Sequence, residues 1–259
     1  MYIDSHCHLD FPQFKDLPDL ISSCSEVGVN EFLVPGTTEG SWSSLIKIRQ
    51  NYPQIKIALG LHPYFLNERV QLDQAMQKLE HFLGYGSVVA VGEIGLDKWP
   101  NMPDYHYQFE VLLEQLRLAK RHNMPVILHA RKSEDDLLKA IRMLNFDRGG
   151  VVHAFNGSFD QAQRFINDGF VLGIGGTVTY PRASKARRVL QALADEHFVI
   201  ETDAPDMPLC GYQGQPNSPI RVVEVAEQVA ILRGQSVEAV AQYTSANLQR
   251  VLPNWYKVK

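Results

Sequence analysis

The sequence is poor in cysteine and lacks long apolar runs. It has three cysteines in 259 residues and no Cys-x-x-Cys pair, so it does not carry a disulfide framework. Such a chain is expected in a reducing compartment, and we predict a cytoplasmic location. No apolar run reaches the about 18 residues that a membrane helix needs, and no basic segment followed by an apolar run marks a signal peptide. We therefore expect no membrane association.

An excess of basic residues is also absent. The chain has 25 Lys and Arg against 29 Asp and Glu, which gives a formal net charge of −4. This balance argues against a broad basic surface that binds nucleic acid by electrostatic attraction. A polyanionic substrate should instead be short, single-stranded or bound at an end, and held by local basic side chains or by metal. No obligate protein partner is evident from the sequence.

What the chain does contain is an alternation of short apolar runs with helical patterns. Eight runs have the length of buried strands, and stripes with apolar residues at i, i+3 and i+4 separate them. This alternation predicts an α/β fold with a parallel sheet. Eight units fit a (β/α)8 TIM barrel, formed by residues 1–259 as a single domain, better than a doubly wound sheet. The predicted strands are Tyr2–Cys7, Glu31–Pro35, Lys56–Leu61, Val88–Gly92, Pro125–His129, Gly150–His153, Phe170–Ile174 and Phe198–Thr202.

The His6-Cys7-His8 motif in the first predicted strand is the most informative feature. Side chains two apart in a strand share a face, so both imidazoles can reach one metal ion while Cys7 packs in the core. The pair alone is a weak signal. Imidazole or carboxylate, however, recurs at six of the eight predicted strand ends, which meet at the catalytic face of a TIM barrel. These residues are His6 and His8, then His62, Glu93, His129, His153 and Asp203.

The ligand types predict metal ions rather than another cofactor. Histidine and carboxylate without cysteine suit zinc, manganese, iron or magnesium. The candidates exceed the three or four ligands that one catalytic ion takes from protein, so we expect two divalent cations per subunit. Two ions need a bridging carboxylate, because an imidazole nitrogen has one lone pair. Glu93 and Asp203 are the candidates for this bridge.

Two further residues are predicted to contact substrate. His62 precedes Pro63 and is expected to donate a hydrogen bond to substrate in preference to binding metal. Arg131 follows His129 by two residues and is expected to bind a phosphate or carboxylate. The alternative for Arg131 is an exposed ion pair with Glu134 or Asp135.

Two carboxylates have open roles. Glu201 should lie one layer below Asp203, where it either orients a ligand or base, or pairs with an inward-facing Lys or Arg. Asp97 either accepts a hydrogen bond near the site or caps its loop.

In order along the chain, these motifs resemble the TatD-type metal-dependent deoxyribonucleases, most strongly the YjjV-like subgroup. The resemblance extends from residue 2 to about residue 250. The motifs that carry it are Asp4-Ser5-His6-Cys7-His8, Gly60-Leu61-His62-Pro63, Gly92-Glu93-Ile94-Gly95-Leu96-Asp97, Pro125-Val126-Ile127-Leu128-His129, His153-Ala154-Phe155-Asn156-Gly157-Ser158 and Glu201-Thr202-Asp203-Ala204-Pro205. The stretches Gly175–Ala183 and Asp206–Leu209 point to the subgroup.

The resemblance implies a TIM barrel with two divalent ions, which would be magnesium, manganese or zinc. It implies that His6, His8, Glu93 and Asp203 hold the first ion, and that Glu93, His129 and His153 hold the second. Glu93 is then the bridge. Ser218 stands where the family often has an arginine, which puts one phosphate contact in doubt.

The leading hypothesis is a deoxyribonuclease or phosphodiesterase that activates water against a phosphodiester bond of DNA or of a small substrate. Asp203 is the candidate acceptor of the water's proton, and Glu93 would set the metal spacing. The alternative is an amidohydrolase-type hydrolase of cyclic amides, lactones or carboxylic esters. Its two-metal members often bridge with a carboxylated lysine at strand four, where this chain has Glu93. A third hypothesis, a non-enzymatic barrel that binds nucleic acid or protein, has little use for so many ligands.

Overall fold

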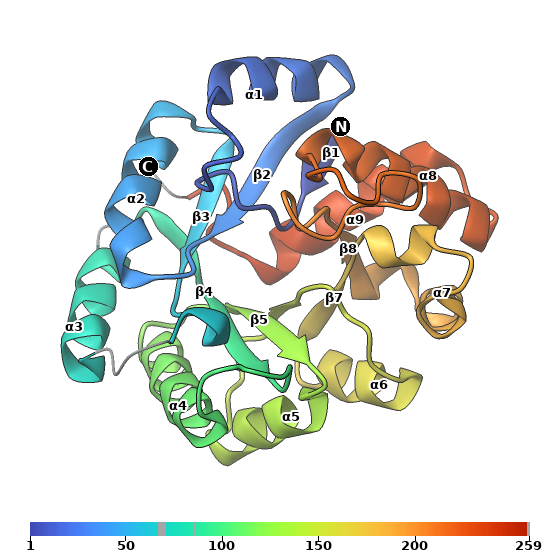
Figure 1. The fold of residues 1–259 in the computed structure, drawn as a ribbon. Coiled ribbons are helices and arrows are strands. Elements are labelled where there is room, and N and C mark those ends of the chain that lie inside the picture. Colours follow the sequence, from blue (N-terminus) through green and yellow to red (C-terminus); the bar gives the residue numbers. More distant parts are fainter. Residues whose placement is uncertain (67–70, 85, 258–259) are drawn as a thin grey trace.

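The computed structural model describes residues 1–66, 71–84 and 86–257. Within these residues, eight parallel strands follow one another in the order β1 to β8 and curl into a nearly closed barrel. Helices alternate with the strands and surround them (Figure 1), which confirms the predicted (β/α)8 fold. The strands are β1 Tyr2–Asp4, β2 Val29–Pro35, β3 Ile55–Leu59, β4 Val88–Asp97, β5 Val126–Arg131, β6 Gly150–Val152, β7 Phe170–Ile174 and β8 Phe198–Ile200. The helices are α1 Leu17–Glu26, α2 Trp42–Asn51, α3 Leu72–Leu83, α4 Tyr105–Arg121, α5 Glu134–Met143, α6 Phe159–Asn167, α7 Ser184–Ala192, α8 Val222–Arg233 and α9 Val237–Val251.

The sequence overestimates the length of the first strand. β1 ends at Asp4, so His6 and His8 lie beyond it and not within it. The chain after β1 bonds alternately to its two neighbours: the N–H of Cys7 donates to the carbonyl of Leu33 at 3.1 Å, and the N–H of His8 donates to the carbonyl of Ala204 at 2.7 Å. The backbone therefore stays extended after β1, although it does not form the regular hydrogen-bond pattern of a strand. The imidazoles of His6 and His8 still face the same point. Cys7 is fully buried in the core, as predicted.

The inside of the barrel is filled with aliphatic side chains toward the amino ends of the strands and with polar side chains toward their carboxyl ends. Inward-facing positions recur every second residue along each strand. Val151 therefore faces inward below His153, and Val199 faces inward below Glu201. The apolar layer consists of Ile3, Leu33, Ala58, Val89, Ala90, Ile127, Val151, Val171 and Val199. The polar layer above it lies at the carboxyl ends of the strands.

The C-terminal segment closes the opposite end of the barrel. Helix α9 contacts β1, β6, β7 and β8, and the buried side chains of Leu248, Val251, Leu252 and Trp255 join the apolar cluster of the barrel interior. The indole N–H of Trp255 donates to Oε2 of Glu31 at 2.9 Å, which satisfies its one polar atom. Among the described residues, the interior of the barrel is thus closed at this end, and the carboxyl ends of the strands face a cavity.

Two of the surrounding helices have ends that their residue types favour. Ser158 caps α6, with its hydroxyl accepting from the N–H of Gln161 and the Gln161 side chain accepting from the N–H of Ser158. Gly28 follows α1 and Gly169 follows α6, with φ of 85° and 88°, a conformation that favours glycine. In the described part of the chain, none of the helices combines the length and the apolarity needed to cross a bilayer.

Candidate metal centre

The structure brings the predicted site residues together at the open end of the barrel. His8, Glu93, His129, His153 and Asp203 line a cavity of about 650 Å³, and His6 is fully buried behind its wall. His62 and Arg131, the predicted substrate contacts, also line it. The four remaining histidines, His81, His106, His122 and His197, do not line it.

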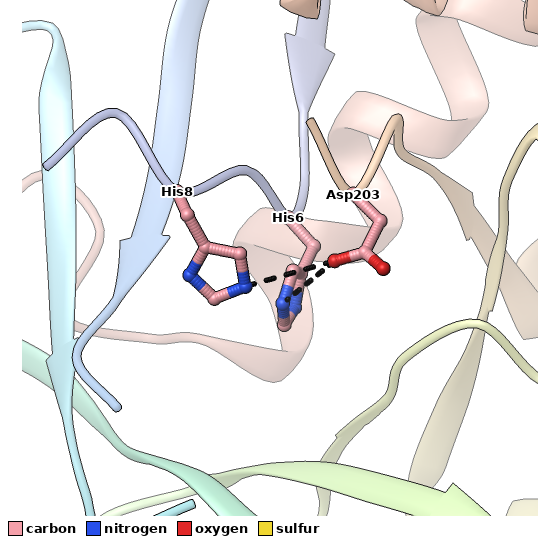
Figure 2. A group of neighbouring side chains, drawn as sticks. All are labelled: His6, His8 and Asp203. Carbon is pink, nitrogen blue, oxygen red and sulfur yellow. Dashed lines mark ion pairs between the residues drawn. The ribbon is translucent and has the colours of Figure 1, made fainter. Parts of the chain in front are cut away.

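A first group of ligand atoms forms where β1 and β8 meet. Nε2 of His6 and Nε2 of His8 each lie 3.6 Å from Oδ1 of Asp203, and Figure 2 shows both imidazoles turned toward this carboxylate. Oε2 of Glu93 lies 3.2 Å from Nε2 of His6 and 3.6 Å from Nε2 of His8. Two imidazoles and two carboxylates thus converge on one point.

A second group forms around the other oxygen of the same glutamate. Oε1 of Glu93 lies 3.0 Å from Nε2 of His153 and 3.1 Å from Nδ1 of His129. These two nitrogens are 3.3 Å apart. His62 joins this group with its Nε2 3.2 Å from Oε1. The carboxylate of Glu93 is the one element common to both groups, with a different oxygen facing each.

The electrostatics suit a carboxylate that stays ionised between imidazoles. Burial acts to raise the pKa of Glu93, but the surrounding histidines, His62 and His153 foremost, hold it well below its usual range. Burial lowers the pKa of His8 to about 3, so this imidazole is neutral and its lone pair is available to a metal. The neutral imidazole and the ionised carboxylate are the forms that bind divalent ions.

An unsatisfied nitrogen provides a second test of whether the site fits metal ions. Nε2 of His6, which faces the first group, is buried and lacks a hydrogen-bond partner among the described residues. A buried polar atom without a partner costs free energy unless a ligand completes it. Ligand atoms within 4.8 Å of one another also define three overlapping sets: His6, His8 and Asp203; His6, Glu93 and His153; and His62, Glu93 and His129. The residues therefore fit divalent cations.

Asp97 fixes the orientation of His129. Oδ2 of Asp97 lies 3.1 Å from Nε2 of His129, on the other side of the ring from Glu93. Oδ1 of Asp97 accepts from the N–H of Trp99 at 2.7 Å, so the residue fills both roles that the sequence left open. Burial acts to lower the pKa of His129, but the hydrogen bonds to Asp97 and Glu93 outweigh it and the pKa is raised. A carboxylate behind a ligating histidine is a common way to orient it toward metal.

Glu201 occupies the equivalent position behind His153. It is fully buried, with Oε1 3.5 Å from Nδ1 of His153 and also accepting from the N–H of Ala154. Ser5 donates its hydroxyl to Oε2 at 3.4 Å. Among the described residues, the ion pair that Glu201 forms is with this histidine and not with an inward Lys or Arg. Of the two roles that the sequence left open, orientation of a ligand is the one that this geometry favours.

The space for Glu201 comes from Gly173 on the neighbouring strand. A Cβ atom at Gly173 would lie 2.3 Å from Oε2 of Glu201, which no real contact allows. In the sequence, the end of β7 has neither a histidine nor a carboxylate that could bind metal. The structure shows why a glycine is needed there.

The hydrogen bonds around His62 determine which of its two ring nitrogens carries the proton. Nδ1 accepts from the N–H of Tyr64 at 3.1 Å, so Nε2 carries the proton in the neutral ring. Burial lowers the pKa of His62, which keeps the ring neutral near pH 7. Nε2–H thus points as a donor at Oε1 of Glu93 and at the cavity.

Arg131 is exposed on the cavity wall. Its guanidinium lies 3.7 Å from the centre of the Trp99 ring, and Asp135 pairs with Arg164 at 2.9 Å. Pairing of Arg131 with Glu134 or Asp135, the alternative from the sequence, is not observed among the described residues.

A buried clamp positions the first group. The carboxylate of Asp4 accepts from the N–H of Thr202 at 3.0 Å, from its hydroxyl at 2.6 Å and from the N–H of His6 at 3.2 Å. The N–H of Asp203 donates to the carbonyl of His6 at 2.9 Å. Asp203 has φ of 57°, in the left-handed region that aspartate tolerates better than most residues. The clamp therefore holds the ligands of β1 and β8 in one register.

Two glutamines of α4 were not identified from the sequence. Oε1 of Gln108 accepts from the N–H of Asp97 at 2.9 Å, and Oε1 of Gln115 accepts from the N–H of Leu61, next to His62, at 2.7 Å. Both side chains are buried. Polar residues on the apolar stripe of a predicted helix are the signal that could have revealed them.

Comparisons with known proteins agree with this geometry. Residues 3–253 match the family of TatD related DNases. A relative in Escherichia coli K12, the uncharacterized metal-dependent hydrolase YjjV, is 43% identical over 244 residues, covering 93% of each chain. The uncharacterized metal-dependent hydrolase YabD of Bacillus subtilis is 31% identical over 254 residues, covering 97% of this chain and 98% of that one.

A solved structure supports the same relationship. The crystal structure of YjjV, a TatD homologue from Escherichia coli K12, superposes with a TM-score of 0.93 at 41% identity. The match covers 97% of this chain and 98% of that chain.

Proposed function

This chain belongs to the family of TatD related DNases and is a metal-dependent hydrolase, and we propose that it hydrolyses phosphodiester bonds of DNA with a centre of two divalent cations. The observation that carries the proposal is the position of Glu93. Its two oxygens face separate groups of imidazoles at 3.0 to 3.6 Å, an arrangement that suits a carboxylate that would bridge two ions. His6, His8 and Asp203 would hold the first ion, and His129 and His153 the second.

The chemistry of a phosphodiester explains why two ions suit this site. Bound divalent ions would lower the pKa of water and stabilise charge on the attacking and leaving oxygens. The net charge of −4 gives the chain no excess of its own positive charge for a polyanion, so local cations have to neutralise the phosphate.

Asp203 is the proposed acceptor of the proton that leaves the attacking water. Burial raises its pKa to about 6, although His153 and His6 act in the opposite direction. In the metal-free chain, a carboxylate with this pKa is ionised at neutral pH, as a proton acceptor has to be. Its Oδ1 faces the ligand atoms of His6 and His8 (Figure 2).

His62 and Arg131 are the proposed substrate contacts. Nε2–H of His62 can donate to a phosphate oxygen, since the N–H of Tyr64 fixes the tautomer. Arg131 presents a cation on the cavity wall that can approach a second phosphate oxygen. In this proposal both would hold the phosphate while Glu93 and Asp203 act at the centre.

The test combines metal content with activity. Purified protein is reconstituted with magnesium, manganese or zinc, analysed by mass spectrometry for bound metal, and assayed on end-labelled single-stranded oligonucleotides and a simple phosphodiester. We expect two ions per chain and a loss of about 10³-fold in kcat/KM for Glu93→Gln, because several kcal/mol of charge stabilisation disappear. Glu114→Gln, an exposed carboxylate on α4, is the matched control.

Two outcomes would reject the proposal. If protein with two bound ions cleaves neither substrate, the proposed phosphodiesterase activity is rejected. If Glu93→Gln keeps full activity, the proposed bridging role of Glu93 is rejected. The amidohydrolase alternative is tested with cyclic amides and lactones in the same assay. End-bound action predicts that a circular single strand is resistant, and products from it would contradict that prediction.

A further inference from the structure

Trp99 is an exposed tryptophan at the edge of the catalytic cavity. The chain has three tryptophans, and the exposed fraction is 0% for Trp42, 1% for Trp255 and 47% for Trp99. Trp99 follows β4 by two residues and lies against Arg131, which lines the cavity. A large apolar ring that remains exposed beside a binding cavity is a candidate for contact with the ligand.

Two cations accompany this ring. The Cζ atom of Arg131 lies 3.7 Å from the centre of the Trp99 ring, and Nζ of Lys132 lies 5.6 Å from it. The side chains of Arg131 and Lys132 form neither a hydrogen bond nor an ion pair with any other described residue. The charge of Arg131 also acts on the nearby carboxylate of Asp97 and helps to lower its pKa. A flat π surface beside two positive charges complements a nucleobase and its phosphate.

Hydrogen bonds hold the backbone that carries the ring in place beside the metal centre. The N–H of Trp99 donates to Oδ1 of Asp97, whose Oδ2 contacts His129. The N–H of Lys98 donates to the carbonyl of Arg131 at 3.0 Å, and Asp97 pairs in register with Arg131 between β4 and β5. The backbone positions that carry the indole and the guanidinium are therefore held beside the ligands of the second group.

Resting on the proposed function, we infer that Trp99, Arg131 and Lys132 form a platform that binds an unpaired nucleobase of single-stranded DNA next to the phosphate in the centre. The base stacks on the exposed part of the indole, and the two cations approach its phosphate. A base inside a duplex has both faces covered by its neighbours and cannot stack in this way. The platform thus selects single strands without reading sequence, since every base has a π face.

The tryptophan itself reports the contact. Because Trp42 and Trp255 are buried, quenching of tryptophan fluorescence by a ligand at the cavity reports mainly on Trp99. The metal-loaded protein is titrated with a short phosphorothioate oligothymidylate, which resists hydrolysis, and with a strand of the same length and backbone that lacks bases. We expect quenching by the first strand and little by the second.

Variants separate stacking from other effects. Trp99→Ala should weaken binding of the oligothymidylate about tenfold, measured by anisotropy of a labelled strand, and leave binding of the abasic strand unchanged. Trp99→Phe keeps an aromatic face and should retain most of the affinity. Tyr256→Ala removes an aromatic residue that is 64% exposed outside this cavity and is the matched control.

Each result decides between the two proposals. Equal quenching by both strands, no quenching, or equal loss of affinity for both strands in Trp99→Ala would overturn the platform. Hydrolysis of an ordinary oligonucleotide by the wild-type protein is measured in parallel. Base-dependent binding without hydrolysis would reject the phosphodiesterase, whereas hydrolysis without base-dependent binding would reject the platform alone.

Discussion

Oδ2 of Asp97 lies 3.1 Å from Nε2 of His129 and fixes the ring so that Nδ1 faces Oε1 of Glu93. The hydrogen bond places the proton of the neutral ring on Nε2 and leaves the lone pair of Nδ1 for a metal ion. The same carboxylate holds the N–H of Trp99, so it connects the metal centre to the edge of the cavity.

Asp97→Ala should weaken the second metal site more than the first. Loss of a carboxylate behind a ligating histidine reduces metal affinity by about 10- to 100-fold. Isothermal titration with manganese should show one weakened and one nearly unchanged site. Asp147→Ala, an exposed carboxylate paired with Arg148, is the control and should leave both sites unchanged. Equal weakening of both sites by Asp97→Ala would contradict the assignment.

Two glycines of β7 and the turn after it give a matched pair of variants. A Cβ at Gly173 would lie 2.3 Å from Oε2 of Glu201, whereas a Cβ at Gly175 would lie 3.5 Å from Cγ of the same side chain, an ordinary contact. Gly173→Ala should displace Glu201 from His153, lower kcat by about tenfold or more, and reduce stability by about 1–3 kcal/mol.

Gly175→Ala should change neither quantity by much, because φ at this position is −113° and an alanine fits. Steady-state kinetics and urea unfolding measure both effects. Normal activity of Gly173→Ala would show that the contact between Glu201 and His153 is dispensable.

Metal affinity should fall as the pH falls through about 6. Burial raises the pKa of Asp203 to about 6 in the metal-free chain. Burial acts to lower the pKa of His153, but Glu93 and Asp203 outweigh it and the pKa lies well above its usual range. Metal has to displace these protons, so each proton released weakens the apparent affinity by up to about tenfold per pH unit below the pKa.

Titration calorimetry in buffers with different ionisation enthalpies counts the protons released. We expect net release on binding at pH 6 to 7, and an affinity that rises with pH over this range. Affinity that is constant between pH 5 and pH 7, without proton release, would show that these groups are already deprotonated.

Trp255→Ala should destabilise the fold without a direct effect on the site. The side chain is 1% exposed and closes the end of the barrel opposite to the cavity. Truncation of a buried tryptophan costs about 3–5 kcal/mol, and here it also removes the partner of Glu31. Urea unfolding measures the loss. Trp99→Ala, at an exposed position, should stay within about 0.5 kcal/mol of wild type. Similar losses for the two variants would contradict the assigned burial.

The fold was predictable because its signals are local. Runs such as Phe170–Ile174 are apolar over the length of a strand, and residues such as Ser158 and Gly169 mark helix ends, so periodicity alone indicates eight βα units. The strand ends were less predictable. β1 stops at Asp4 because the following residues bond alternately to β2 and to the segment after β8, a pairing that depends on barrel closure.

By itself, the sequence determined which residue types stand at the carboxyl ends of the strands, and these included His6, His8 and Glu93. Chain order and the spacing of one βα unit suffice for that, since parallel strands bring their ends to one edge. Tertiary structure decided which oxygen of Glu93 faces which histidines, that Asp97 and Glu201 lie behind ligands, and that Trp99 lies against Arg131. These relations depend on side-chain orientation and on contacts between strands distant in sequence, which local patterns do not encode.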